Sequence, residues 1–179
     1  MPQRLALVLA AAIVTTCLGG CASGLPEDVA KLGYVDRVNR LAMNTPPGWQ
    51  VRELTGLAPV IVSKPGGPPG AARPCITVDV IPGLGSESLE MLARSSLARL
   101  ASVPGFLLVR EDPTTTAAGQ KAWTVTFELA PAGAPIKERQ MLLMAGDKVY
   151  VVTAAAAADA FDAEAPNFDI CFGSLRAGW

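Results

Sequence analysis

The feature that most constrains the fold is the segment 123–129, in which apolar and polar side chains alternate without a break. The apolar set is Trp, Val, Phe and Leu, and the polar set is Thr, Thr and Glu. Alternation of this kind places the two sets on opposite faces of a strand, one packed and one wet. Short turns at 131–135 and 146–147 join it to apolar segments at 136–144 and 148–154. Because short connections join antiparallel neighbours, the sequence predicts a three-stranded meander.

Two further segments have the apolar spacing of helices. In the first, Ser86 is the expected N-cap, Glu87 and Glu90 lie in the first turn, and the helix ends before Pro104. Its apolar face consists of Leu89, Leu92, Leu97 and Leu100, with Ala93 and Ser96 between them. The second helix has an apolar face made of Phe161, Ala165, Phe168, Phe172 and Leu175. It requires Pro166 to lie near its first turn, where a missing N–H is tolerated.

Shorter apolar segments complete the expected sheet. They are residues 39–44, 49–54, 59–63, 75–81 and 106–111. Residues 64–74 contain too much proline and glycine for regular structure and are expected to form a surface loop, and residues 112–120 a polar turn. The predicted fold class is α+β, with a curved antiparallel sheet of about six to seven strands packed between or against two helices.

The N-terminus has the three zones of an export signal. Arg4 supplies a positive charge, residues 5–14 are apolar, and small residues follow. The apolar run is too short to span a bilayer, which needs about 20 residues. Leu18-Gly19-Gly20-Cys21 resembles the lipobox of bacterial lipoproteins. The resemblance implies cleavage before Cys21 and acylation of that cysteine, and the alternative is an ordinary export signal with a chance cysteine.

These features predict three regions. Residues 1–20 form a lipoprotein signal peptide, 21–37 an acylated N-terminus and tether, and 38–179 a single domain. Cys17 would leave with the signal, so it forms no pair with Cys21. Two acyl chains hold a protein stably on a membrane. Ala22 replaces the aspartate that retains enterobacterial lipoproteins at the inner membrane, which favours the outer membrane, facing the periplasm, if the cell has two membranes.

The composition argues against several classes of function. Without Arg4 the chain has 14 basic and 16 acidic residues, and it has no basic run of the kind that nucleic-acid binding needs. It contains no histidine, which excludes Ser-His-Asp and Cys-His catalysis and nearly all catalytic zinc sites. No S-x-x-K or G-x-S-x-G motif is present. We therefore expect no catalytic residues, no metal, no cofactor and no enzyme activity.

Two cysteines remain in the predicted mature chain, Cys75 and Cys171. In an oxidising, exported compartment such a pair is readily interpreted as a disulfide. It would close a loop of roughly 100 residues, for which the chain-entropy model gives about 4 to 5 kcal/mol. The alternative is two separate buried thiols that behave as small apolar side chains.

Three motifs suggest ligand sites that other features of the chain oppose. Gly83-Leu84-Gly85 between a strand and a helix imitates a dinucleotide fingerprint, but Ser88 replaces the third glycine. A group of acids lacks the spacing of a calcium loop and is expected to be solvated. They are Asp159, Asp162, Glu164 and Asp169. The loop 64–74 could bind a partner in an extended conformation, although it has no reliable P-x-x-P context.

The order of these elements resembles the PsbP and DcrB superfamily of α/β/α sandwiches. The likeness covers residues 38–176 and is carried by the motifs at 44–49, 75–81, 86–91, 105–106 and 168–176 together with the hairpins of 119–154. The insertion at 64–74 and the cysteine pair depart from it. The resemblance implies a non-catalytic protein, since members serve as photosystem II accessory subunits, a Ran GTPase partner and bacterial envelope lipoproteins.

The sequence therefore predicts a membrane-anchored envelope lipoprotein that binds a protein partner as an accessory or assembly factor. The alternative is a carrier of a small apolar ligand or lipid. An exposed apolar patch would favour the first function. An internal pocket lined by the aromatic side chains would favour the second. Those side chains are Trp49, Trp123, Phe127, Phe161, Phe168 and Phe172.

Overall fold

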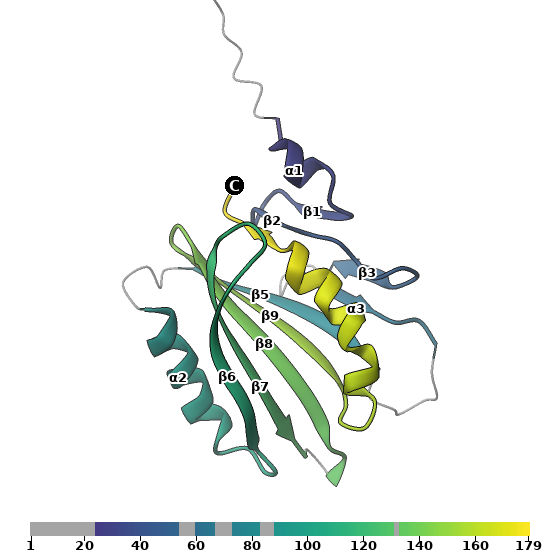
Figure 1. Cartoon of the computed structure of the whole chain (residues 1–179), viewed down its shortest axis with the longest axis vertical. Coiled ribbons are helices and arrows are strands. Elements are labelled where there is room, and N and C mark those ends of the chain that lie inside the picture. Colours follow the sequence, from purple (N-terminus) through teal and green to yellow (C-terminus); the bar gives the residue numbers. More distant parts are fainter. Residues whose placement is uncertain (1–23, 54–59, 67–72, 83–87, 131–132) are drawn as a thin grey trace, which may run out of the picture.

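A seven-stranded antiparallel sheet forms the centre of the molecule (Figure 1). The computed structural model describes residues 24–53, 60–66, 73–82, 88–130 and 133–179. The predicted signal, Cys21, Ser86, the glycine motif at 83–85 and most of the loop 64–74 lie outside these residues. The strands are β3 (Gln50–Glu53), β4 (Val60–Ser63), β5 (Cys75–Pro82), β6 (Leu107–Thr115), β7 (Lys121–Leu129), β8 (Ile136–Ala145) and β9 (Lys148–Ala157).

The strand order is β3-β4-β5-β9-β8-β7-β6. β7 pairs with β8 and β8 with β9, each antiparallel, so the predicted meander is confirmed. β5 and β6 lie three strands apart, with β9, β8 and β7 between them. The two strands therefore do not form the parallel βαβ unit that a dinucleotide site needs, in agreement with our interpretation of that motif.

One helix covers each face of the sheet. α2 (Leu89–Leu100) packs on one face, in a cluster that includes Val125, Phe127 and Leu142. α3 (Phe161–Ser174) packs on the other, in a cluster that includes Ile76, Tyr150 and Val152. The predicted α+β class is confirmed, and the apolar faces predicted for the two helices are the faces that pack on the sheet. Each helix buries its apolar face against the sheet surface on its own side.

The start of α2 differs from the prediction. Ser88, not Ser86, is the N-cap, and its hydroxyl accepts a hydrogen bond of 3.2 Å from the backbone N–H of Met91. Both serines have the chemistry of a cap, and the helix begins at the one that directly precedes its apolar face. Glu90 lies in the first turn as expected.

The N-terminal segment is more ordered than a tether. α1 (Glu27–Ala30) forms directly after Pro26, and β1 (Tyr34–Asp36) pairs with β2 (Leu41–Met43). β10 (Arg176–Ala177) adds to β2, so a small three-stranded sheet joins both ends of the described chain. Val29 and Tyr34 are buried. The packed part of the chain therefore begins before residue 38, because Val29 is buried and Tyr34 belongs to the cluster on the α3 face.

Strands β6 and β9 extend furthest beyond their predicted ends. β6 continues through Pro113 to Thr115, where we expected a turn, and β9 continues through alanines to Ala157. Proline is tolerated in β6 because this strand is at the edge of the sheet, where one side of its backbone has no ladder partner. Pro166 lies at the sixth position of α3, beyond the expected first turn. The carbonyl of Asp162 consequently lacks its helical N–H donor.

Candidate functional site: a polar groove beside an exposed edge strand

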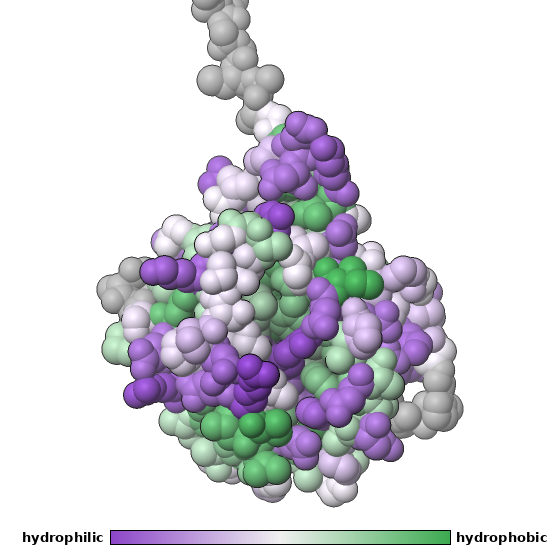
Figure 2. All heavy atoms as spheres, in the orientation of Figure 1, coloured by the Kyte–Doolittle hydropathy of each residue, from purple (hydrophilic) through white to green (hydrophobic). Residues whose placement is uncertain are grey.

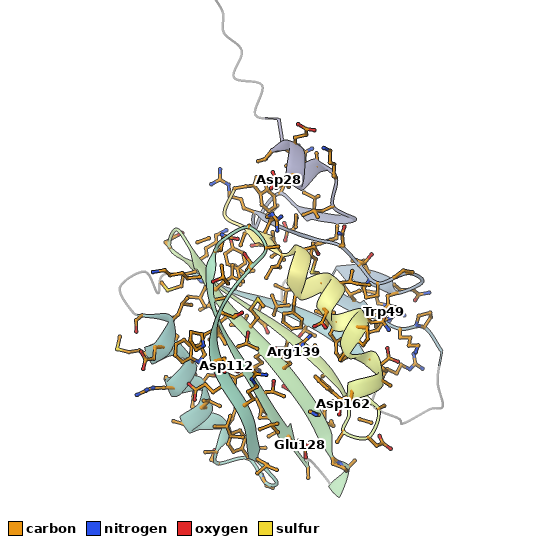
Figure 3. The ribbon with its side chains drawn as sticks, viewed as in Figure 1. Asp28, Trp49, Asp112, Glu128, Arg139 and Asp162 are labelled. Carbon is orange, nitrogen blue, oxygen red and sulfur yellow. The ribbon has the colours of Figure 1, made fainter. Side chains whose placement is uncertain are left out.

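A groove of about 550 Å³ lies between the last three strands of the sheet and α3. Side chains from three strands and one helix line the groove. They are Arg110, Asp112 and Thr114 of β6, Thr124 and Thr126 of β7, Arg139 and Met141 of β8, and Asp169 and Phe172 of α3. Figure 3 shows Arg139 near α3 and Asp112 farther from it, on β6. The groove exists because α3 packs over β9 and β2 and leaves β6 and β7 uncovered on this face.

The threonines of the predicted wet face form part of the groove lining. Thr124 and Thr126 alternate with Val125 along β7, and Val125 packs in the α2 cluster. Their hydroxyls therefore point toward the α3 side of the sheet. This part of the site follows from the sequence pattern, whereas the arginine and aspartate residues that complete it were not predicted.

Arg139 is the most constrained side chain of the groove. Its Nη2 donates a hydrogen bond of 2.7 Å to Asp169 Oδ1, and its guanidinium lies 4.5 Å from the centre of the Phe172 ring. Its Nε is buried and has no hydrogen-bond partner among the described residues. The side chain is 21% exposed. The groove thus contains a guanidinium that Asp169 and Phe172 hold in place, and any ligand would have to contact it through its exposed part rather than through the buried Nε.

The outer wall of the groove carries a second ion pair. Arg110 Nε donates to Asp112 Oδ2, and both side chains extend from the same face of β6. With Arg139 and Asp169, the groove contains two cations and two carboxylates. Its surface is therefore polar without an excess of either charge. Phe172 is the only one of the six candidate core aromatics that lines it.

An exposed apolar segment begins next to this wall. We call Leu107, Leu108 and Val109 the edge patch; they are 59%, 43% and 49% exposed. They lie at the start of β6, the last strand of the sheet, and the register with β7 shifts between Leu108 and Arg110. Figure 2 shows a hydrophobic area at the lower edge of the molecule, over this end of β6. Exposed apolar residues on an edge strand are unusual, because they offer a place for another strand to pair.

The predicted disulfide is absent. Cys75 and Cys171 are free thiols. Cys75 precedes Ile76 in β5, and Ile76 belongs to the α3 cluster together with Cys171. Alternation along the strand therefore places Cys75 on the α2 face, with the sheet between the two sulfur atoms. The structure therefore agrees with the alternative of two separate thiols. The sequence could not distinguish the two possibilities, because it does not show which face of the sheet α3 covers.

We expect alkylation of the unfolded, unreduced protein to label both Cys75 and Cys171. In the native protein at pH 8, Cys171 should stay unlabelled, because burial raises the pKa of its thiol to about 12 and the thiolate is the reactive form. Burial and the nearby Glu138 carboxylate also raise the pKa of Cys75, so its labelling should be slow. Peptide mapping by mass spectrometry measures both, and recovery of a disulfide-linked peptide pair would contradict the expectation.

The acids considered for calcium are mostly occupied by cations of the protein itself. Asp162 accepts a hydrogen bond from Lys137 at 2.9 Å, and Asp169 pairs with Arg139. Glu164 is bound by Lys64 at 2.6 Å, and this hydrogen bond is the main cause that lowers the pKa of Glu164. Across the described ranges, no three metal-ligating side chains gather in one place.

The carboxylates that burial affects most lie away from the groove. Burial raises the pKa of Asp79 and Glu138. Their register places both on the α2 face, because Asp79 pairs with Val151 and Glu138 with Phe127. A cleft with converging carboxylates of raised pKa is the usual sign of acid–base catalysis. The groove on the α3 face does not contain this pair.

Within the part of the chain that the structure describes, no helix is long and apolar enough to cross a bilayer. The sequence matches no family model and no curated protein. Solved structures are similar in fold. LpqN of Mycobacterium tuberculosis, described as involved in cell envelope biogenesis, is 14% identical, with a TM-score of 0.61 over 78% of this chain and 83% of its own.

Two other solved structures extend this comparison. Cyanobacterial PsbP of Synechocystis sp. PCC 6803 is 12% identical, with a TM-score of 0.59 over 80% of this chain and 90% of its own. The Ran-binding protein Mog1p of Saccharomyces cerevisiae is 11% identical, with a TM-score of 0.55 over 80% of this chain and 93% of its own. At these identities the likeness concerns the fold alone. The chain therefore has the PsbP-like α+β fold that these proteins share.

Proposed function

We propose that the chain is a non-catalytic lipoprotein of the cell envelope, acylated at Cys21, that binds a protein partner as an accessory or assembly factor. The observation that carries the proposal is the edge patch on β6. Its partner is an extended polypeptide segment with apolar side chains, which adds to the sheet as an eighth strand. The lipobox resemblance and the similarity to an envelope biogenesis protein support the location.

The sequence of β6 limits where such a strand can pair. Pro113 has no N–H to donate, so a continuous ladder is interrupted there. Arg110, Glu111 and Asp112 are charged, and charges on an edge oppose indiscriminate pairing. Apolar contact is therefore concentrated on Leu107, Leu108 and Val109. A short partner segment, rather than a second copy of the whole strand, fits this arrangement.

The groove supports a second candidate, the carrier function. Its volume of about 550 Å³ is in the range of small-molecule sites. Its lining, however, carries threonine hydroxyls and two ion pairs beside its apolar side chains, and the other core aromatics pack elsewhere. A ligand bound there would need polar groups to satisfy these side chains. Because of these polar groups, carriage of a purely apolar molecule is less well supported than protein binding.

A photo-crosslinking amino acid introduced at Val109 in intact cells tests the proposal. We expect a covalent adduct with another envelope protein. Val51 is the matched control position, because it is an exposed apolar residue on β3 at the opposite edge of the sheet and should give no such adduct. Recovery of lipid alone at Val109, with no protein neighbour, would favour the carrier and contradict partner binding.

The substitution Val109→Lys should reduce capture of that partner by about tenfold or more, since loss of a central apolar contact with burial of a charge costs 1–3 kcal/mol at an interface. The free energy of unfolding should change by less than about 0.5 kcal/mol, because the side chain is half exposed. Val51→Lys is the control for added charge. Equal capture by all three proteins would exclude the edge patch as the binding site.

A further inference from the structure

The end of the molecule at which the described chain begins, at Gly24, carries a second unusual surface. α1, the connection from β1 to β2 and the C-terminal segment lie together there (Figure 1). Residues 24–26, Arg37, Arg40 and Trp179 surround a hollow of about 380 Å³. The side chain of Val38 is 84% exposed, more than any other exposed large apolar residue of the described chain.

The turn that presents Val38 is held in place on several sides. Asp36 Oδ1 accepts hydrogen bonds of 2.9 Å from the backbone N–H groups of Val38 and Asn39. The Tyr150 hydroxyl donates a bond of 2.6 Å to the Asn39 carbonyl, and the Arg40 carbonyl accepts one of 2.7 Å from Gly178. This turn is therefore fixed to the main sheet and to the C-terminal segment. The exposure of Val38 is a property of the folded domain rather than of a loose loop.

Positive charge flanks the exposed valine. Arg37 and Arg40 are exposed and have no ion-pair partner among the residues described. The acids of the neighbouring helix are already engaged, since Glu27 pairs with Lys31 and Asp28 with Arg176. The Asp36 carboxylate is the nearest opposing charge on the turn, and it is used by the turn's own N–H groups.

The distance to the predicted anchor is short. Gly24, the first described residue, follows Cys21 by three positions, and a fully extended chain of three residue steps spans at most about 11 Å. Gly24 lines the same hollow as Arg37 and Arg40. An acylated Cys21 would therefore hold this end of the domain at the lipid headgroups.

We propose that the turn from Asp36 to Arg40, together with Trp179, is a membrane-contacting surface that inserts Val38 among the headgroups of an anionic phospholipid leaflet. This inference rests on the lipid anchor of the proposed function. Arginine binds phosphate through paired N–H donors, and tryptophan favours the membrane interface. The contact orients the domain, so that the edge patch, at the opposite end of the molecule in Figure 1, points away from the membrane toward a partner.

Quenching by phospholipids with brominated acyl chains tests this contact. The protein is purified from cells that express the full chain, and its mass establishes whether Cys21 is acylated. It is then incorporated into vesicles of phosphatidylcholine with or without phosphatidylglycerol. We expect the indole introduced by Val38→Trp to be quenched, after correction for the native tryptophans. The matched position Val109→Trp, also exposed but at the other end of the domain, should remain unquenched.

The charges are tested in the Val38→Trp protein. Each arginine near an anionic surface contributes a factor of about five in binding. The double substitution Arg37→Gln and Arg40→Gln should therefore lower quenching on anionic vesicles to the level on neutral ones. Arg94→Gln with Arg99→Gln, which removes equal charge from exposed positions on α2, should leave it unchanged.

The outcomes separate this contact from the anchor. An acylated Cys21 with an unquenched indole at position 38 overturns the membrane-contacting surface and leaves the lipid anchor intact. An unmodified Cys21 overturns the anchor, and quenching on anionic vesicles in that case supports the surface on its own. An unmodified Cys21 without quenching overturns both. Equal effects of the two double substitutions would also overturn the assignment to Arg37 and Arg40.

Discussion

Replacement of Phe168 by alanine should lower the free energy of unfolding by about 3–5 kcal/mol, the usual cost of removing a fully buried phenylalanine. Phe168 has no exposed surface and lies between two other rings on the α3 face of the sheet. Its ring centre is 6.0 Å from that of Trp49, edge-on, and 5.1 Å from that of Phe161. The substitution therefore leaves a cavity and removes two aromatic contacts, and urea denaturation followed by fluorescence measures the loss.

Ile170→Ala is the matched control for Phe168→Ala. It also removes an apolar side chain from α3, but Ile170 is 36% exposed. We expect a smaller loss, of about 1–2 kcal/mol, since the side chain that is removed is smaller and is already partly exposed. A similar loss in both variants would mean that helix formation, rather than packing of α3 on the sheet, dominates stability. Phe168 belongs to a cluster that does not include the edge patch, so partner capture by the folded variant should be retained.

Gly105→Ala should destabilise the protein by about 2–5 kcal/mol, because left-handed backbone costs a non-glycine residue about 1–2 kcal/mol and overpacking adds about 1–3 kcal/mol. Gly105 has a φ of 75° in the connection from α2 to β6. A Cβ there would lie 2.5 Å from the Cβ of Ala130 and 2.9 Å from its backbone nitrogen. That nitrogen donates a hydrogen bond of 3.3 Å to the Pro104 carbonyl, so the backbone would have to shift.

Gly119→Ala separates the two causes. Gly119 has nearly the same φ, 76°, in the turn between β6 and β7, but a Cβ there meets no atom within 4 Å. Its expected cost is about 1–2 kcal/mol from the backbone conformation alone. Thermal or urea unfolding of both variants measures the difference. Equal costs would show that the approach of Gly105 to Ala130 relaxes without penalty.

The fold was predictable where a local pattern carried the information. Alternation at 123–129 identified β7 and the side chains that pack on α2, and helical spacing identified the buried faces of α2 and α3. Boundaries were less predictable. Two serines could cap α2, and Pro113 suggested a turn although an edge strand accepts it. In both cases the boundary depends on the tertiary contacts of the backbone, which the local sequence does not show.

The candidate site was predictable only in part. The polar face of β7 identified two of the groove threonines, while Arg139 and Asp169 became a pair through the packing of α3 beside β8. No local signal marks either residue, because 30 positions separate them. In the sequence, the edge patch resembles the apolar start of any strand. Its exposure follows from the position of β6 as the last strand of the sheet.

The amino-acid sequence by itself determined the α+β class, the alternating and helical apolar faces, and the absence of histidine chemistry, since these depend on residue types and on spacings of a few positions. Only the tertiary structure decided that Cys75 and Cys171 lie on opposite faces, that a polar groove opens beside α3, and that the turn holding Val38 is exposed beside residues 24–26. These features depend on strand order and on which face each helix covers, and such contacts join residues that are far apart along the chain.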